Sequence, residues 1–172
     1  FDGEEWLYFP SIPIDVAIVR ATSSDLDGNL SYEHEGAYLG AYDQALAAHN
    51  NGGIVIAQVK RIVERGSIPT QAVRVPGILI DYAVEAPEQM QTTQTGYDPA
   101  ISGEIRRAES GFEGVPWSVD KVTARRAAQE LTKGEAVNLG FGISALVPRI
   151  CLEEGYSQEV SWAIEQGAVG GV

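Results

Sequence analysis

The chain has 172 residues, enough for one domain or two small ones, and its 44% hydrophobic and 21% charged content is that of an ordinary globular protein. The formal net charge of −12 argues against a general nucleic-acid binder, which needs a basic surface. No stretch approaches the ~18 uncharged apolar residues of a membrane span, and no signal peptide is visible. The single cysteine excludes an internal disulfide framework and fits a reducing compartment.

The first part of the chain alternates between strand and helix patterns. Residues 12–22 and 53–63 are rich in β-branched and apolar residues, which predicts two buried strands. The Asp-Gly pair and the asparagine within 25–30 predict a turn. Residues 38–50 have a helix-forming composition and run into two asparagines and two glycines, which is a helix-stop signal.

The character of the chain changes in its middle. Residues 72–84 are strand-like, but Pro76-Gly77 interrupts them, which predicts two short strands or a bulge. Residues 86–117 then hold three prolines and many Gly, Thr and Gln residues. This composition indicates a crossover or an interdomain linker.

A second unit is expected after the linker. Residues 119–134 predict a helix that ends at a glycine, and 135–141 predict a strand. Residues 143–155 predict another helix, and 159–167 predict the next strand. Strand–helix–strand at this spacing indicates a parallel α/β unit, in which ligands bind beyond the carboxyl ends of the strands.

Several motifs point to ligand chemistry without deciding it. Gly140-x-Gly142-x-x-Ala145, with Glu159 about twenty residues later, matches a dinucleotide fingerprint in form, but the match is weak, and a tight strand-to-helix turn in which glycine allows close packing is the simpler explanation. Residues 25–36 fail as a calcium loop, because the required Gly and Glu positions are occupied by other residues. Two histidines and one cysteine in the whole chain argue against a zinc site, and no Gly-x-Ser-x-Gly elbow is present.

Half of the basic residues lie in one part of the acidic chain. The cluster is either a solvated helix face and linker or a local attractor for phosphates. Its members are Arg106, Arg107, Lys121, Arg125, Arg126 and Lys133.

Glu165 ends an apolar run and precedes a glycine-rich stretch. A glutamate at a strand end is commonly solvated or ion-paired, but a carboxylate in this position could also act as a nucleophile. Such a carboxylate must be placed accurately and partly desolvated. Small neighbours would let a substrate approach closely and could offer backbone N–H donors. These neighbours are Gly167, Ala168, Gly170 and Gly171.

The order of these motifs resembles the family I coenzyme A transferases. "VNLGFGIS" is followed about twenty residues later by "EQGAVGG", similar to the family's Gly-x-Gly turn and its catalytic Glu-x-Gly motif. Upstream, "PIDVAIVRATSSDLDGNLSYE", "GGIVIAQVKRIVERGSIP" and "VPGILIDYAV" look like the end of the family's first domain. The similarity is greatest to fused transferases that act on short-chain acyl groups, such as acetate or propionate.

The resemblance implies an α/β fold made of parts of two open, mainly parallel domains. Residues 1–107 would end the first domain, 108–118 would form a linker, and 119–172 would begin the second domain. The chain would then be an internal segment of a longer polypeptide. Two features depart from the family pattern: Ser144 stands where proline is frequent, and the glycine-rich oxyanion loop of the first domain is missing. The isolated chain is therefore expected to be inactive.

The resemblance also implies roles for residues. Glu165 corresponds to the nucleophile, which forms a glutamyl-CoA thioester in a ping-pong reaction. The substrate-binding or CoA-binding positions would be Gly140, Gly142, Gly167, Gly170 and Gly171.

The expected partners are an acyl-CoA, a carboxylic acid, the remainder of the polypeptide and further copies in a homo-oligomer, without nucleic acid or membrane. Coenzyme A would be a co-substrate, with no permanently bound cofactor and no metal. The compartment would be the bacterial cytoplasm, or the mitochondrion in a eukaryote. A thioester hydrolase on the same fold and a dinucleotide-binding α/β module remain as alternatives.

Overall fold

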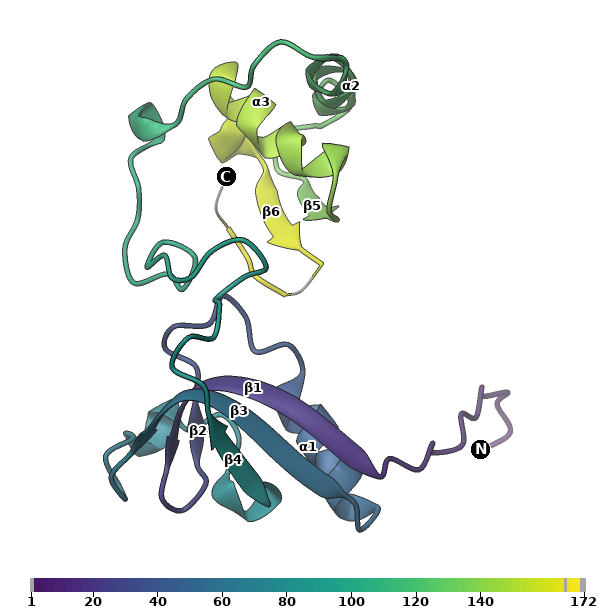
Figure 1. Ribbon diagram of the computed structural model, residues 1–172. Helices are drawn as coiled ribbons and strands as arrows, with labels where there is room; N and C mark the ends of the chain where they lie inside the picture. Colours follow the sequence, from purple (N-terminus) through teal and green to yellow (C-terminus); the bar gives the residue numbers. More distant parts are fainter. Residues whose placement is uncertain (1, 166, 171–172) are drawn as a thin grey trace. The chain divides into compact units, whose positions relative to one another are not determined.

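The computed structural model describes residues 2–165 and 167–170, and the chain divides into two compact units, Phe1–Tyr97 and Asp98–Val172 (Figure 1). Each unit has its own buried apolar cluster and its own sheet. No helix within the described ranges is long and apolar enough to cross a membrane.

The first unit is built on a four-stranded sheet in the order β2-β1-β3-β4. β1, β3 and β4 run parallel, and β2 pairs antiparallel with β1 across the turn predicted at 25–30. The strands are β1 (Val16–Asp25), β2 (Leu30–Ser31), β3 (Ile54–Val63) and β4 (Tyr82–Glu85). The two predicted long strands are confirmed, although β1 begins four residues later than its pattern suggested.

One helix, α1 (Ala41–Asn50), packs on this sheet (Figure 1). It buries Ala41, Ala45 and Ala48, whose small side chains allow the helix to approach the strands closely. The facing strand β3 contributes alternate inward residues, Val55, Ala57 and Val59, each 0% exposed. These alternate side chains of the parallel strand are therefore buried against the helix, and they form part of the core of the unit.

The interruption predicted at Pro76-Gly77 is a crossing point of two chain segments. Residues Gly77–Leu79 form a short 3-10 helix, and only Tyr82–Glu85 joins the sheet as a strand. A Cβ atom on Gly77 would lie 1.9 Å from the carbonyl oxygen of Asp27, so only glycine fits there. The first of the two predicted short strands is reduced to a single bridge between Val75 and Leu30.

The segment that follows β4 has little regular structure, as its composition predicted. From Ala86 to Ser118 its only assigned helix is the 3-10 turn Glu109–Gly111. The early part is tied down by Arg20, which donates hydrogen bonds to the carbonyl oxygens of Met90 and Gln91 at 2.8 Å. Arg20 also pairs with the buried carboxylate of Glu35.

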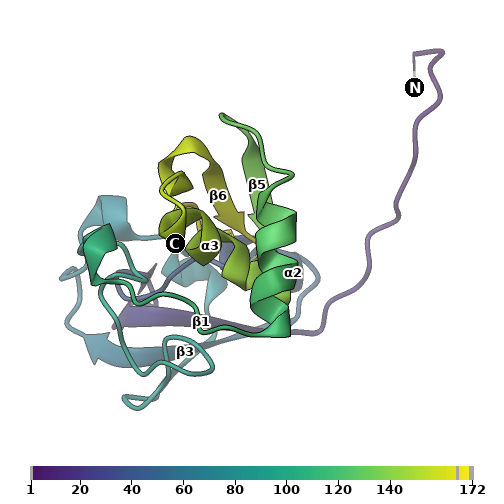
Figure 2. The same cartoon turned by 90° about the horizontal axis from the view of Figure 1, so that it is seen from above.

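The second unit combines a two-stranded parallel sheet with two neighbouring helices (Figures 1 and 2). Alanines of α2 pack with apolar residues of α3 and with Leu139 and Trp162 of the strands. The elements are α2 (Val119–Ala128), β5 (Ala136–Leu139), α3 (Val147–Glu153) and β6 (Ser161–Ile164). The prediction of an α/β fold with mainly parallel sheets is confirmed.

The boundaries of this unit differ from the sequence-based ranges. α2 ends at Ala128, well before Gly134, and the helix expected over 143–155 is a 3-10 turn followed by α3. β6 is shorter than predicted, and Glu159 lies in a 3-10 turn before it. The compact unit, Asp98–Val172, includes the segment 108–118.

Candidate active site

The carboxyl ends of β5 and β6 lie side by side. Leu139 pairs with Ile164 in the parallel register, and the N–H of Glu165 donates a 3.0 Å hydrogen bond to the carbonyl oxygen of Leu139. Glu165 is therefore the first residue beyond β6 and is held by its backbone to the end of β5. This is the edge of a parallel sheet at which ligands generally bind.

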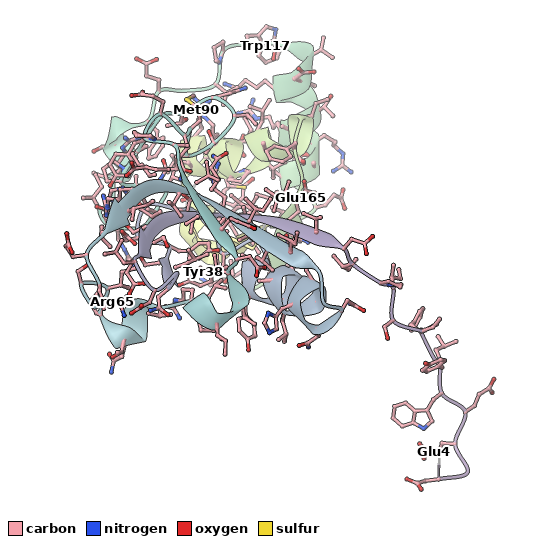
Figure 3. All side chains as sticks on the ribbon, turned by 60° about the horizontal axis from the view of Figure 1, so that its bottom comes forward. Glu4, Tyr38, Arg65, Met90, Trp117 and Glu165 are labelled. Atoms are coloured by element: carbon pink, nitrogen blue, oxygen red, sulfur yellow. The ribbon has the colours of Figure 1, made fainter. Side chains whose placement is uncertain are left out.

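The side chain of Glu165 lies against a residue that has no side chain. Its Oε2 atom is 3.4 Å from the position that a Cβ atom on Gly140 would occupy. Glu165, which is labelled in Figure 3, is exposed, so a molecule from solvent can reach the carboxylate. The sequence predicted that Gly140 and Glu165 belong to one site, and the structure brings these two residues together.

The turn after β5 is fixed by a hydroxyl and by an unusual glycine. The Oγ of Ser144 donates to the carbonyl oxygen of Gly140 at 3.1 Å. Gly142 has φ 91° and ψ −142°, a conformation that residues with a Cβ rarely adopt. Ser144 thus stabilises the turn through its side chain. The sequence analysis identified Ser144 but did not predict its hydrogen bond to Gly140. The spacing of four residues between the two was the sequence feature that could have indicated this bond.

Beyond Glu165 the chain turns back along β6. Gly167 donates to the carbonyl oxygen of Ile164 at 2.7 Å, and Gly170 donates to that of Trp162 at 2.8 Å. Both glycines have positive φ, 102° and 89°, as tight turns require. Their N–H groups are already used, so their contribution is to the shape of the loop. Gly171 lies outside the described residues.

Other backbone donors remain at the same edge. Among residues 2–165 and 167–170, no group accepts a hydrogen bond from the N–H of Phe141 or Gly142. These two amides lie in the turn that contains Gly140. The arrangement therefore combines a carboxylate, a neighbouring residue without a side chain, and two backbone N–H groups of the kind that can stabilise a negatively charged oxygen.

The dinucleotide alternative does not fit this geometry. A ribose-binding acid should lie at the carboxyl end of the second strand, near the glycine turn. Glu159 instead precedes β6, where its backbone carbonyl accepts from Gly134 at 2.7 Å, and its carboxylate pairs with Lys133 at 3.2 Å. It therefore lies at the opposite end of the sheet from Gly142.

Metal and phosphate sites also lack support in the described part of the chain. Within it, no group of three or more His, Cys, Asp or Glu side chains could hold a metal ion. Five members of the basic cluster form ion pairs with carboxylates, which favours the solvated-face interpretation over a phosphate attractor. The pairs are Arg107–Asp98, Lys121–Glu153, Arg125–Glu154, Arg126–Glu130 and Lys133–Glu159.

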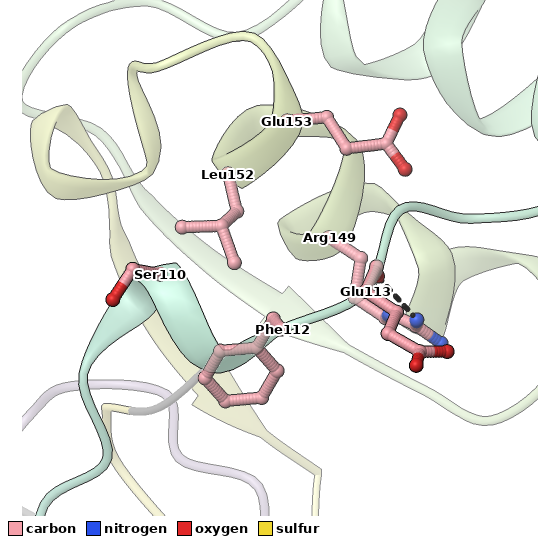
Figure 4. A pocket seen from close by; sticks show the side chains of 6 residues that line it. All are labelled: Ser110, Phe112, Glu113, Arg149, Leu152 and Glu153. Carbon is pink, nitrogen blue, oxygen red and sulfur yellow. Dashed lines mark hydrogen bonds between the residues drawn. The ribbon is translucent and has the colours of Figure 1, made fainter.

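A second feature of this unit was not foreseen from the sequence. A pocket of about 260 Å³ lies between α3 and the segment before α2 (Figure 4). Arg149 donates a 3.0 Å hydrogen bond to the carbonyl oxygen of Glu113, and its Nε is buried without a partner among the described residues. The lining residues are Ser110, Phe112, Glu113, Arg149, Leu152 and Glu153.

Comparison with known proteins agrees with this fold. The family model for coenzyme A transferase matches residues 1–86, half of the chain. The caffeate CoA-transferase of Acetobacterium woodii is 41% identical over 175 residues, and the acetate CoA-transferase YdiF of Escherichia coli K12 is 38% identical over 175 residues. Each alignment covers 100% of this chain and 33% of the relative.

A solved structure supports the same conclusion. The acyl-CoA transferase YdiF of Escherichia coli O157:H7, in a thioester complex with CoA, superposes with a TM-score of 0.83 at 37% identity. The match covers 100% of this chain and 32% of that one. The chain belongs to the coenzyme A transferase family, and it spans about a third of the length of these relatives.

Proposed function

We propose that this chain is the part of a coenzyme A transferase that carries the nucleophile, and that the nucleophile is Glu165. The observation that carries the proposal is the position of the Glu165 carboxylate beside Gly140, at the carboxyl ends of two parallel strands. A carboxylate is a weak nucleophile, so its reactivity depends on placement and on unhindered approach. Both requirements are served by an exposed carboxylate next to a residue without a side chain.

The reaction would proceed through two covalent intermediates. A carboxylate oxygen of Glu165 attacks the acyl carbon of an acyl-CoA and expels the CoA thiolate, which leaves a mixed anhydride. The thiolate then attacks the glutamyl carbonyl and expels the first acid, which forms a glutamyl-CoA thioester. A second carboxylate reverses these steps and leaves as its CoA ester. The free energy of the thioester is conserved, and the kinetics would be ping-pong.

The negative charge that develops on the attacked oxygen needs hydrogen-bond donors. The N–H groups of Phe141 and Gly142 would serve as such donors, since they follow Gly140 in the same turn and no described residue accepts from them. The loss of one such donor typically costs about 3 kcal/mol of transition-state stabilisation. Residues outside this chain would supply further donors, which is the reason to expect little activity from the chain alone.

The substrates we propose are a short-chain acyl-CoA and a carboxylic acid acceptor such as acetate, with coenzyme A as co-substrate. The similar proteins are named for caffeate and for acetate, which supports a carboxylic acid acceptor in general. We further propose that residues 1–107 form the end of one domain and that residues 119–172 form the beginning of the next. Residues 108–118 would be the linker between them. A cytoplasmic homo-oligomer is the form we expect of the full-length protein.

Trapping of the intermediate tests this function. The full-length protein is incubated with acetyl-CoA and no acceptor, and the thioester is then reduced with borohydride. We expect loss of activity and an alcohol at residue 165, in which two hydrogens replace one oxygen, found by peptide mass analysis across 160–172. A carboxylate that only binds substrate cannot be reduced in this way.

The control is the Glu165→Gln variant treated identically, which should remain unmodified in this peptide. Inactivation with the modified group in another peptide would remove Glu165 from the nucleophile role. The hydrolase alternative is separated by measuring free CoA with and without acetate. Continuous release of free CoA that acetate does not change would favour hydrolysis, because transfer moves CoA onto the acceptor and releases none.

A further inference from the structure

A second pocket lies in the first unit, at the start of α1. Its volume is about 120 Å³. No step of the proposed transfer uses it, and nothing in the sequence motifs pointed to it. The residues that line it are Tyr32, Tyr38, Ala41, Tyr42, Arg74 and Val75.

The pocket contains a buried hydroxyl for which the described part of the chain offers no hydrogen-bond partner. Tyr32 is 6% exposed, and its hydroxyl oxygen has no hydrogen-bond partner among the described residues. Burial raises the pKa of this phenol, and Glu35 raises it further, so the hydroxyl is a protonated donor at neutral pH. The charge of Glu35 itself is already paired with Arg20. Buried donors without acceptors are rare in folded proteins, which points to an absent acceptor.

The pocket also contains a cation that no carboxylate of the described residues neutralises. The guanidinium of Arg74 lies 4.7 Å from the ring centre of Tyr38, which is labelled in Figure 3. Within the described residues, Arg74 forms no ion pair. By contrast, the other three arginines of this unit all pair with carboxylates, as Arg20–Glu35, Arg61–Glu33 and Arg65–Asp27.

The beginning of α1 supplies backbone N–H donors, which, like the Arg74 cation, favour a negatively charged ligand. The helix has ten residues and starts after Gly40, which offers no side chain to cap it. In the described part of the chain, nothing accepts from the N–H groups of Tyr42 and Asp43. A helix N-terminus of this kind favours an anion. Asp43 is exposed, and it is not among the lining residues.

We propose that this pocket binds a short-chain monocarboxylate. The carboxylate accepts hydrogen bonds from the Tyr32 hydroxyl, the Arg74 guanidinium and the first amides of α1. Its alkyl group lies against Ala41 and Val75. A carboxylate fits better than phosphate, because the pocket is small, has a single cation and is lined largely by aromatic and aliphatic carbon. The proposal does not depend on the chemistry of Glu165.

The test follows the methyl groups of the pocket directly. The full-length protein is labelled with ¹³C-methyl alanine and valine, and propionate is titrated at constant ionic strength while the signals of Ala41 and Val75 are observed. We expect saturable shifts of both signals at millimolar propionate. Inorganic phosphate, titrated in parallel, should not produce them. Because the readout is local, binding of propionate elsewhere does not affect it.

Two variants and two matched controls make the test decisive. Arg74→Gln should weaken propionate binding by about tenfold or more, since a charge-assisted hydrogen bond is lost. Tyr32→Phe keeps the ring and should weaken it by about fivefold. Arg65→Gln and Tyr82→Phe remove an exposed charge and an exposed hydroxyl outside the pocket, and should change nothing.

Absence of saturable shifts would overturn the proposal, as would shifts with phosphate alone. Unchanged affinity in a folded Arg74→Gln variant would also overturn it. If Tyr32→Phe does not fold, the Arg74→Gln result decides the matter.

Discussion

The Oε2 atom of Glu165 lies 3.4 Å from the point at which a side chain on Gly140 would begin. The two residues are 25 positions apart in sequence (165 − 140), and the pairing of β5 with β6 brings them together. Carboxylate and glycine thus form one surface, with the carboxylate exposed and the glycine leaving its approach open. The proposed chemistry depends on both halves of this relationship.

The first prediction is that transfer depends on the length of the Glu165 side chain. Glu165→Asp in the full-length protein withdraws the carboxylate by roughly one methylene, or ~1.5 Å, and should lower kcat by about a hundredfold or more, because misplacement of this size disrupts attack geometry. Glu165→Ala should abolish transfer. Since the side chain is exposed, the free energy of unfolding should change by less than about 0.5 kcal/mol in both variants. Retention of more than a few per cent of activity by Glu165→Ala would contradict the assignment.

The open approach at Gly140 gives a second prediction. A methyl group at this position would contact the Glu165 carboxylate without forcing the backbone to move, since the φ of Gly140 is not in the left-handed region. Gly140→Ala should therefore fold normally and lower kcat/KM by about tenfold or more. Gly111→Ala is the matched control, because a Cβ there meets open space. Equal activity of the two variants would show that substrates do not approach across Gly140.

The main elements could be predicted because their signals are local. β1 and β3 are rich in β-branched and apolar residues, and the glycines of the 140–142 turn follow a strand. The end of α2 could not be predicted from the glycine stop signal. Thr132 donates from its N–H at 2.8 Å and from its hydroxyl at 3.0 Å to the carboxylate of Glu135, and these bonds compete with helix continuation.

The pockets could not be predicted for a different reason. The lining of the smaller one unites residues near Tyr32 and α1 with Arg74 and Val75, which lie more than 30 positions further along the chain. No periodicity or motif in the sequence indicates that residues so far apart along the chain lie close together in space. The unpartnered hydroxyl of Tyr32 becomes visible only when its surroundings are known, because tyrosine is common in ordinary cores.

Glu153 predicts a response of the second unit to acid. Its carboxylate accepts from the Nζ of Lys121 and from the N–H of Val115, and these bonds lower the pKa of Glu153, that of Lys121 contributing most. A lowered pKa in the folded state means that the stabilisation is complete above the unfolded value near 4.5 and is lost as pH falls through the folded value. The exchange protection of the Val115 N–H, corrected for intrinsic rates, should therefore fall below about pH 4.5.

Glu153→Gln supplies the comparison for this prediction. The variant should have weaker protection at pH 7 and a flatter dependence on pH, because its amide cannot titrate. Glu130→Gln removes a carboxylate from the exposed pair with Arg126, which contributes little to stability, and should behave like the unchanged protein. A Glu153→Gln profile as steep as that of the unchanged protein would assign the acid response to another group.

The crossing of two chain segments at Gly77 gives the last prediction, which concerns stability alone. A Cβ atom on Gly77 would lie 1.9 Å from the carbonyl oxygen of Asp27 and 3.0 Å from the backbone nitrogen of Asn29. Neither is a flexible side chain, so Gly77→Ala must separate the two segments. The separation also strains the 2.9 Å hydrogen bond from the Gly77 N–H to Asn29 Oδ1. We expect a loss of about 2–3 kcal/mol in the free energy of unfolding of the first unit, measured by urea titration.

Gly96→Ala is the control in the same unit, because a Cβ there meets nothing within 4 Å and its φ is not in the left-handed region. That variant should be neutral or slightly stabilising, through the smaller entropy of its unfolded chain. Both substitutions add one methyl group to a glycine, so the difference between their free energies of unfolding measures the cost of the steric clash at Gly77. If both variants unfold at the same urea concentration, the segments at Asp27 and Gly77 are not in the close contact described here, and the interruption of the strand pattern at Pro76 needs another cause.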